Sequence, residues 1–172
     1  MLHLGGRAAV DQALSRLARR GELVRISRGL YVLPVEGRFG RRSPSVAKTV
    51  AALAAHRGER IVASGATAAN ALGLTTQVPV RTVVLTSGRT RTLELGRQKV
   101  ELRHAPHWQL VLGDSRPGQA LRALAWLERD NAARSLDYMR QVLAPEERQS
   151  LAKVAAQLPD WLAAHVSCLA HD

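Results

Sequence analysis

The sequence predicts an α+β protein with a small helix-and-hairpin module first, a mixed α/β region next and a helical last third. Apolar residues recur at helical spacing over residues 7–20 and again after residue 116. Between residues 22 and 104, short runs rich in Val, Leu and Ile are bounded by glycine and proline, as β-strands are. Aromatic residues make up only 3% of the chain, so its core must be built mainly from Leu, Val and Ala.

The composition excludes several classes of protein. The 172 residues suffice for one domain or two small ones. A single cysteine, Cys168, rules out a disulfide framework, and its apolar helical surroundings predict a small buried residue. No apolar run approaches the roughly 18 residues that span a bilayer, and we expect no signal peptide. We therefore expect a soluble cytoplasmic protein.

Positive charge is concentrated in the first two thirds of the chain. Lys and Arg number 25 against 14 acidic residues, a net charge of +11. Residues 1–42 and residues 43–112 each carry nine basic and three acidic residues, whereas residues 113–172 carry seven and eight. An excess of this size indicates a polyanionic partner, first of all nucleic acid. The alternative is a basic composition shared by the whole proteome.

The first element is a helix over residues 7–20. Val10, Leu14 and Leu17 lie on one face of it, and Gly21 follows where a left-handed residue ends a helix most easily. The opposite face is polar and carries several arginines.

Two short strands follow this helix and complete a predicted module over residues 1–36. They span residues 22–27 and 30–33 and are joined by a turn at Arg28–Gly29. A helix, a glycine and a basic hairpin form the second half of a winged helix-turn-helix, in which the helix enters the major groove of DNA. The residues expected to touch bases or phosphates are Arg7, Gln12, Ser15, Arg16, Arg19, Arg25 and Arg28.

Two blocks of the sequence resemble AbiEi-type antitoxins of type IV (abortive-infection) toxin–antitoxin systems. The N-terminal module of that family is similar to LGGRAAVDQALSRLARRGELVRISRGLYVLP, and the start of its antitoxin domain is similar to IVASGATAANALGLTTQVPVRTVVLTSGRTR. The blocks occur in the family's order, and the resemblance covers roughly residues 4–104. It implies that the winged helix binds the operon's own promoter and that the rest of the chain counters a nucleotidyltransferase-like toxin, directly or functionally.

The module departs from the family at its start, because only Met1–Leu4 precede Gly5 where one or two further helices are usual. Leaving the apolar face of the first helix bare would cost several kcal/mol. Three alternatives would cover it: residues further down the chain, a second subunit, or a segment encoded upstream of Met1.

Residues 37–44 are predicted to be a linker. They lie in the run PVEGRFGRRSP, residues 34–44, which is rich in Pro, Gly and Arg. An antitoxin or interaction domain over residues 45–172 follows. Its first elements are a helix capped by Ser45, a short helix and four strands, expected in chain order at residues 46–56, 61–63, 66–72, 81–86, 93–95 and 99–104.

The last third is predicted to be helical over about residues 117–170. The expected helices span residues 117–129 and 135–143, then begin at Pro145 and at Asp160. The first buries Leu121, Leu124 and Ala125, with Trp126 a further candidate. The last helix is the candidate contact with a second copy or with the toxin.

Two further features have an ordinary and a functional interpretation. Thr90 and Thr92 alternate with Arg89 and Arg91, which predicts a solvated strand face and a possible secondary basic surface for nucleic acid. Ser64 stands between a strand and a helix, where anions can bind, but no Gly-Lys-Ser/Thr follows it. We therefore expect Ser64 to be a helix cap.

No constellation of residues indicates an enzyme. His104 and His107 lie three apart but straddle Pro106 and have no carboxylate or thiol nearby, so we expect neither a metal nor a cofactor. The leading hypothesis is an antitoxin that binds the double-stranded DNA of its own promoter. The alternatives are a winged-helix regulator without antitoxin activity and a basic module that binds an acidic protein. A homodimer remains open, because promoters usually present two half-sites.

Overall fold

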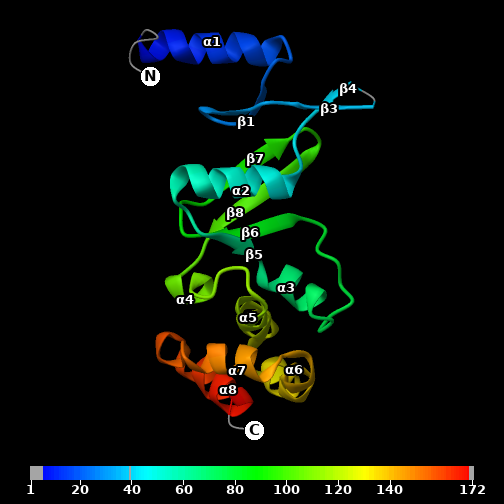
Figure 1. Cartoon of the computed structure of the whole chain (residues 1–172), viewed down its shortest axis with the longest axis vertical. Helices are drawn as coiled ribbons and strands as arrows, with labels where there is room; N and C mark the ends of the chain where they lie inside the picture. Colours follow the sequence, from blue (N-terminus) through cyan, green and yellow to red (C-terminus); the bar gives the residue numbers. More distant parts are fainter. Residues whose placement is uncertain (1–5, 39, 171–172) are drawn as a thin grey trace.

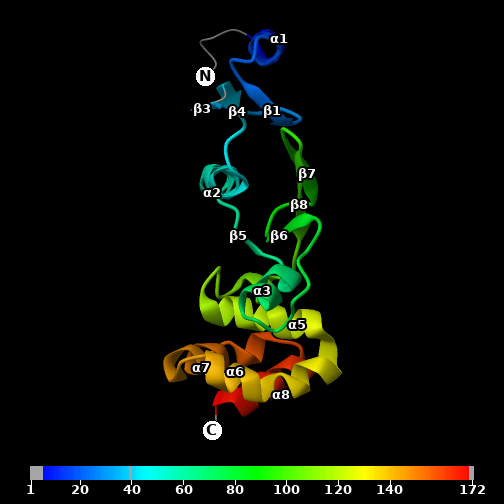
Figure 2. The same cartoon turned by 90° about the vertical axis from the view of Figure 1, so that its right-hand side faces the viewer.

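A computed structural model describes residues 6–38 and 40–170 and confirms a mixed α+β fold. The molecule is elongated, with α1 (Arg7–Arg19) at one end, a four-stranded sheet in the middle and the C-terminal helices at the other end (Figures 1 and 2). No helix in the described part of the chain is both long and apolar enough to cross a membrane.

Helix α1 is followed by an antiparallel hairpin of β1 (Val24–Ser27) and β2 (Leu30–Val32), as the sequence predicted. Their two-residue turn contains Gly29, whose φ of +68° is accessible to glycine without strain. Ile26 points from β1 into the body of the molecule and is only 1% exposed. No residue of α1 is buried to this degree.

A second hairpin occupies the segment that was expected to be a linker. It pairs β3 (Val35–Gly37) with β4 (Gly40–Arg42), and Val35 stands opposite Arg42. All six strand residues are exposed, so the hairpin is held by its backbone pairing rather than by a core. It extends from the end of the molecule that carries α1 (Figure 1).

The central sheet has the strand order β5-β6-β8-β7, in which only β6 and β8 run parallel. Its strands are β5 (Ile61–Ala63), β6 (Thr82–Thr86), β7 (Arg91–Leu95) and β8 (Gln98–His104). One face packs against α2 (Val46–Arg57) and hairpin β1–β2. The buried side chains there are Ile26, Leu53, Leu93, Leu95, Val100 and Leu102. The first hairpin and the sheet therefore share one core.

The other face of the sheet is covered only in part. Leu85 packs there with Val62, Ala105 and Leu110, the last of which belongs to the short α4 (His107–Leu110). Helix α3 (Gly65–Ala71) follows β5 and packs against α5 (Arg116–Arg134). The backbones approach so closely that a Cβ at Gly65 would lie 2.6 Å from the carbonyl oxygen of Arg122.

The C-terminal helices form a separate apolar cluster with α3 and α5. They are α6 (Leu136–Val142), α7 (Pro145–Ala152), a 3₁₀ turn (Ala155–Gln157) and α8 (Asp160–Ala170). Helix α5 passes the predicted end at residue 129, although its path is broken at Glu128, where φ is +62°. Leu121 and Leu124 are fully buried as expected, whereas Trp126 is 41% exposed.

The prediction that Cys168 is buried was wrong, because its thiol-bearing side chain is exposed. Leu162, Val166 and Leu169 occupy the inner face of α8 and are completely buried. Cys168 lies on the outer face, so the apolar character of the stretch did not determine its orientation.

Candidate nucleic-acid interface

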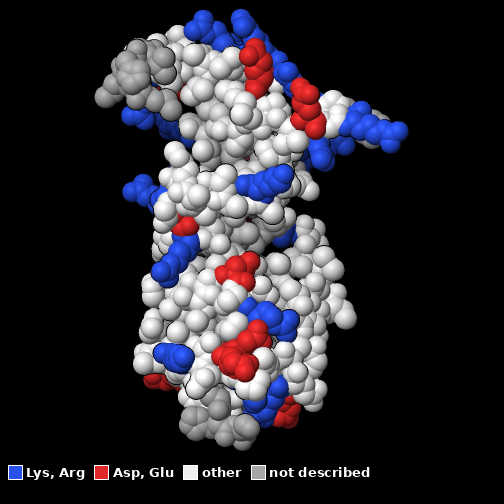
Figure 3. All heavy atoms as spheres, in the orientation of Figure 1, with Lys and Arg blue, Asp and Glu red and all other residues white. Residues whose placement is uncertain are grey.

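The residues predicted to touch DNA all lie at the α1 end of the molecule. Arg7, Gln12, Arg16 and Arg19 are exposed on α1, and Arg25 and Arg28 are exposed on hairpin β1–β2. Ser15 is half-buried, because a hydrogen bond of 3.3 Å joins its Oγ to the hydroxyl of Tyr31 on β2. This bond ties the middle of the helix to the hairpin. Basic side chains are prominent at this end in the space-filling view (Figure 3).

A groove of about 530 Å³ runs between α1 and the hairpin. Its charged lining consists of three arginines, Arg7, Arg25 and Arg28, and one carboxylate, Asp11. Ser15, Gly29 and Tyr31 complete its walls. The helix and the hairpin tip therefore present their basic residues to one shared space rather than to opposite sides.

A second hollow of about 410 Å³ continues along α1. It is lined by Gln12, Arg16 and Arg19 and shares Asp11 and Ser15 with the groove. The two hollows therefore adjoin and bring together all seven residues selected from the sequence. We call this surface of Arg7, Gln12, Ser15, Arg16, Arg19, Arg25 and Arg28 the basic tip.

The guanidinium groups of the basic tip are not engaged by carboxylates of the described residues. None of the five forms a salt bridge with another residue in the described ranges 6–38 and 40–170. An exposed guanidinium without a carboxylate partner can donate to phosphate oxygens or to base edges without breaking an existing pair.

Hairpin β3–β4 adds three basic residues that the sequence interpretation did not include. Arg38, Arg41 and Arg42 are exposed, and Arg41 Nε lies 3.6 Å from Glu36 Oε1. The available signal was the pair of glycines, Gly37 and Gly40, flanking a two-residue turn within an otherwise arginine-rich run.

The apolar face of α1 is half-covered. Val10, Leu14 and Leu17 are each of intermediate exposure, and within the described residues the element that α1 contacts most is β1 of the first hairpin. The helix is closed at its end by the backbone N–H groups of Glu22 and Leu23, which both donate to the carbonyl of Leu17.

The expected secondary basic surface does not form as expected. Arg91 lies on the sheet face that carries Leu93 and Leu95, so it points inward and is only 16% exposed. Its Nη2 lies 2.6 Å from Glu59 Oε2, which makes it a structural ion pair. Arg89 is exposed but belongs to the turn before β7.

Glu59 is held in its charged form by this arrangement. Burial raises the pKa of the Glu59 carboxyl, but hydrogen bonds from Arg91 and from the hydroxyl of Thr86 outweigh burial and bring the pKa below its usual value. The group therefore joins the start of β5, the end of β6 and the start of β7.

The remaining sequence candidates have structural roles or none. Ser64 caps α3 by accepting a hydrogen bond of 3.4 Å from the backbone N–H of Thr67. His104 Nδ1 is within 2.9 Å of the carbonyl oxygen of Gly88. Within the described residues, no group of three or more His, Cys, Asp or Glu side chains is placed to hold a metal ion.

The comparison with known proteins gives one match. The model of a family of unknown function, DUF6088, matches residues 1–151, so it spans the basic tip, the sheet and most of the helical region. No curated protein and no solved structure matches the chain. The chain therefore belongs to the DUF6088 family.

Proposed function

We propose that this protein binds double-stranded DNA through the basic tip and acts as the antitoxin of a type IV toxin–antitoxin system. The observation that carries the DNA-binding proposal is the convergence of five arginines from α1 and hairpin β1–β2 on two adjoining hollows. None of the five makes a salt bridge with another residue that the structure describes. The antitoxin part is supported by the two sequence blocks that resemble AbiEi-type antitoxins, which fall on α1 through β2 and on β5 through the start of β7.

The chemistry of the basic tip suits duplex DNA. Ala8 and Ala9 are small and exposed on α1, so a groove edge or phosphate can approach the helix backbone closely. Gln12 and Arg16 occupy positions i and i+4 of the same helix and project side by side. A glutamine suits adenine and an arginine suits guanine in the major groove. Arg25 and Arg28, on the hairpin, would contact the phosphate backbone.

The first experiment is fluorescence anisotropy of a labelled duplex from upstream of the gene, beside a scrambled duplex, at several salt concentrations. We expect tighter binding to the native duplex and a steep loss of affinity with salt on both. Arg28→Ala should weaken both duplexes equally and reduce the salt slope by about one unit. Gln12→Ala should cost about 1–3 kcal/mol on the native duplex alone.

An exposed arginine far from the basic tip supplies the matched control. Arg134 lies in the last turn of α5, and Arg134→Ala should leave both affinities and both salt slopes unchanged. Equal losses from Arg134→Ala and Arg28→Ala would mean that overall charge alone drives binding. Affinity that is insensitive to Arg16→Glu combined with Arg19→Glu would overturn the DNA proposal and favour a module that binds an acidic protein.

The antitoxin proposal has its own test, because neutralisation and DNA binding are assigned to different parts of the chain. Where a nucleotidyltransferase-type gene lies directly downstream of this one, that gene is expressed with the full chain or with the Arg16→Glu, Arg19→Glu variant. We expect both proteins to restore growth, whereas only the first represses the promoter. If neither restores growth, the protein is a regulator without antitoxin activity.

A further inference from the structure

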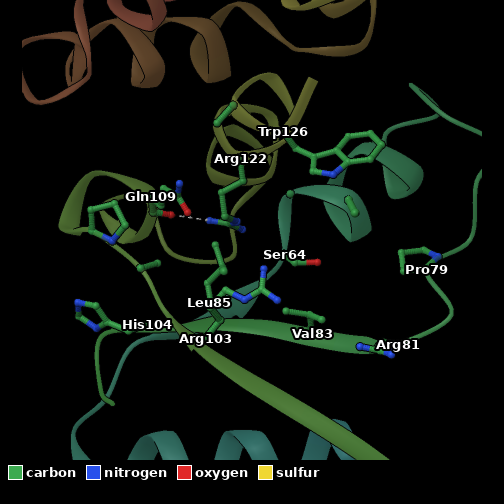
Figure 4. Close-up of a pocket in the computed structure, with 15 residues that line it drawn as sticks. Ser64, Pro79, Arg81, Val83, Leu85, Arg103, His104, Gln109, Arg122 and Trp126 are labelled. Atoms are coloured by element: carbon green, nitrogen blue, oxygen red, sulfur yellow. Dashed lines mark hydrogen bonds between the residues drawn. The ribbon is translucent and has the colours of Figure 1, made fainter. Parts of the chain in front are cut away.

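Another hollow lined by arginines lies in the middle of the molecule, apart from the two hollows of the basic tip. It has a volume of about 380 Å³ and is enclosed by β6 and β8, the start of α3, and α5 (Figure 4). Arg103 rises from β8 toward Ser64, while Trp126 lies on the opposite side, above the start of α3 (Figure 4). This volume falls in the range of pockets for small molecules.

The charged side chains that line this hollow are arginines. Arg81, Arg103, Arg122 and His104 belong to its lining, and none of its described lining residues is Asp or Glu. Arg103 faces the hollow from β8, Arg81 from the segment just before β6 and Arg122 from α5, which also screens the hollow from solvent in part. Such a space favours an anion.

Arg122 forms the inner wall. Its side chain is 1% exposed, and its guanidinium donates to the carbonyls of Gln109 and Gly113 and to Asp114 Oδ1, at 3.2, 2.7 and 3.1 Å. Burial lowers the pKa of Arg122, and the charge of Asp114 opposes that effect. Its Nε is buried and has no hydrogen-bond partner among the described residues. The wall thus contains a donor that lacks an acceptor.

Two arginines nearer the opening retain binding capacity. Arg103 directs Nε and Nη2 to Glu101 Oε1, at 3.2 and 3.0 Å, which leaves Nη1 without a described partner. Arg81 is exposed and makes no salt bridge with a residue in the described part of the chain. Guanidinium groups bind phosphate oxygens with good geometry.

The rim of the hollow is apolar. Trp126, which is 41% exposed, and Pro79 both belong to its lining. An exposed indole beside a cationic pocket offers a stacking face for a planar ring, and such stacking tolerates any base.

We propose that this hollow binds a nucleoside phosphate, with the phosphate on Arg81 and Arg103 and the base against Trp126. The proposal is independent of DNA binding by the basic tip, which lies at the far end of the molecule.

Isothermal titration of the full chain with each of the four ribonucleoside triphosphates, with tripolyphosphate and with a nucleoside tests this proposal. We expect at least one triphosphate to bind, the nucleoside not to bind, and tripolyphosphate to bind at least about tenfold more weakly than the best nucleotide. Arg81→Ala and Arg103→Ala should each weaken nucleotide binding by about tenfold or more. Trp126→Ala should weaken the nucleotide but not tripolyphosphate.

Three controls separate this site from others. Arg81 and Arg103 are exposed, so their alanine variants should melt as the parent does, and a changed melting curve would be resolved with the Lys variants, which keep the charge. Arg134→Ala and the Arg16→Glu, Arg19→Glu variant should bind nucleotide normally. Absence of binding by every triphosphate overturns the proposal. Loss confined to the tip variant, or equal affinity for tripolyphosphate and nucleotide, overturns it as well.

Discussion

Replacing Arg91 by Met should destabilise the protein by about 2–3 kcal/mol at neutral pH. The substitution keeps the length of the aliphatic stem and removes the guanidinium that lies 2.6 Å from Glu59. Glu59 would then remain 13% exposed with the hydroxyl of Thr86, 3.0 Å away, as its other side-chain donor. A carboxylate left in that position lacks the solvation that water or a cation would supply.

The magnitude follows from the burial of the pair. A hydrogen bond to a charged group contributes about 1.5–3 kcal/mol, and removing one member of a fully buried ion pair costs about 3–5 kcal/mol. Because the Arg91 side chain is 16% exposed, water can solvate the Glu59 carboxylate in part after the substitution. We therefore expect a loss of stability at the lower end of these two ranges. For a chain of this size, the thermal midpoint should fall by roughly 5–10 °C.

The loss should depend on pH in a definite direction. The pKa of Glu59 is lower in the folded protein than its usual value of 4.5. A carboxyl of this kind contributes stability that is present above its unfolded pKa and is lost as pH falls through its folded pKa. The difference between parent and variant should therefore be full at neutral pH and should shrink in acid below about pH 4.

Urea titration followed by circular dichroism, at neutral and at acidic pH, measures both effects. The matched control is Arg97→Met, which changes an exposed arginine in the neighbouring turn and should alter stability by less than about 0.5 kcal/mol. A loss from Arg91→Met as small as that of the control would refute the reasoning. So would a loss of equal size at both pH values.

Three other outcomes follow from local geometry. Gly88→Ala should cost about 1–3 kcal/mol in a urea titration, because the new Cβ would collide with the carboxylate of Glu59; an unchanged midpoint would show that Glu59 moves aside freely. Leu14→Asp should release α1 from the hairpin and raise amide exchange chiefly over residues 7–19, since no α1 residue is fully buried; loss of exchange protection throughout the sheet would contradict this. Cys168 should react with a thiol reagent in the native protein at a rate close to that in urea, and strong native protection would show that α8 is covered.

Most element boundaries could be predicted because their signals are local. Gly21 follows α1, the hydroxyl of Ser45 accepts a hydrogen bond of 3.4 Å from the backbone N–H of Lys48, and Pro145 begins α7. Each of these depends on residues within one helical turn. The same locality explains why the residues of the basic tip could be selected together from the sequence, since they all come from Arg7 to Arg28.

The features that escaped prediction depend on distant residues. Arg91 points inward, where it pairs with Glu59, a residue 32 positions earlier in the chain. The residue pattern of β7 alone contains no sign of that distant partner. The central hollow combines Arg81 from the segment before β6, Arg103 from β8 and Trp126 from α5, which the sequence spreads over 46 positions. The β3–β4 hairpin was missed for another reason, since without buried residues its strands lack an apolar pattern.

The shared core of hairpin β1–β2 and the sheet determines how the molecule can be divided. A fragment that begins at Ser45 would lose Ile26 and leave Leu93 and Leu95 without part of their cover, so it should aggregate. A cut at Gly21 removes only α1, which buries nothing completely. Helix α1 can therefore be exchanged by itself. A chimera with a different α1 on the same hairpin should fold as the parent does, while the DNA sequence that we propose it binds should differ.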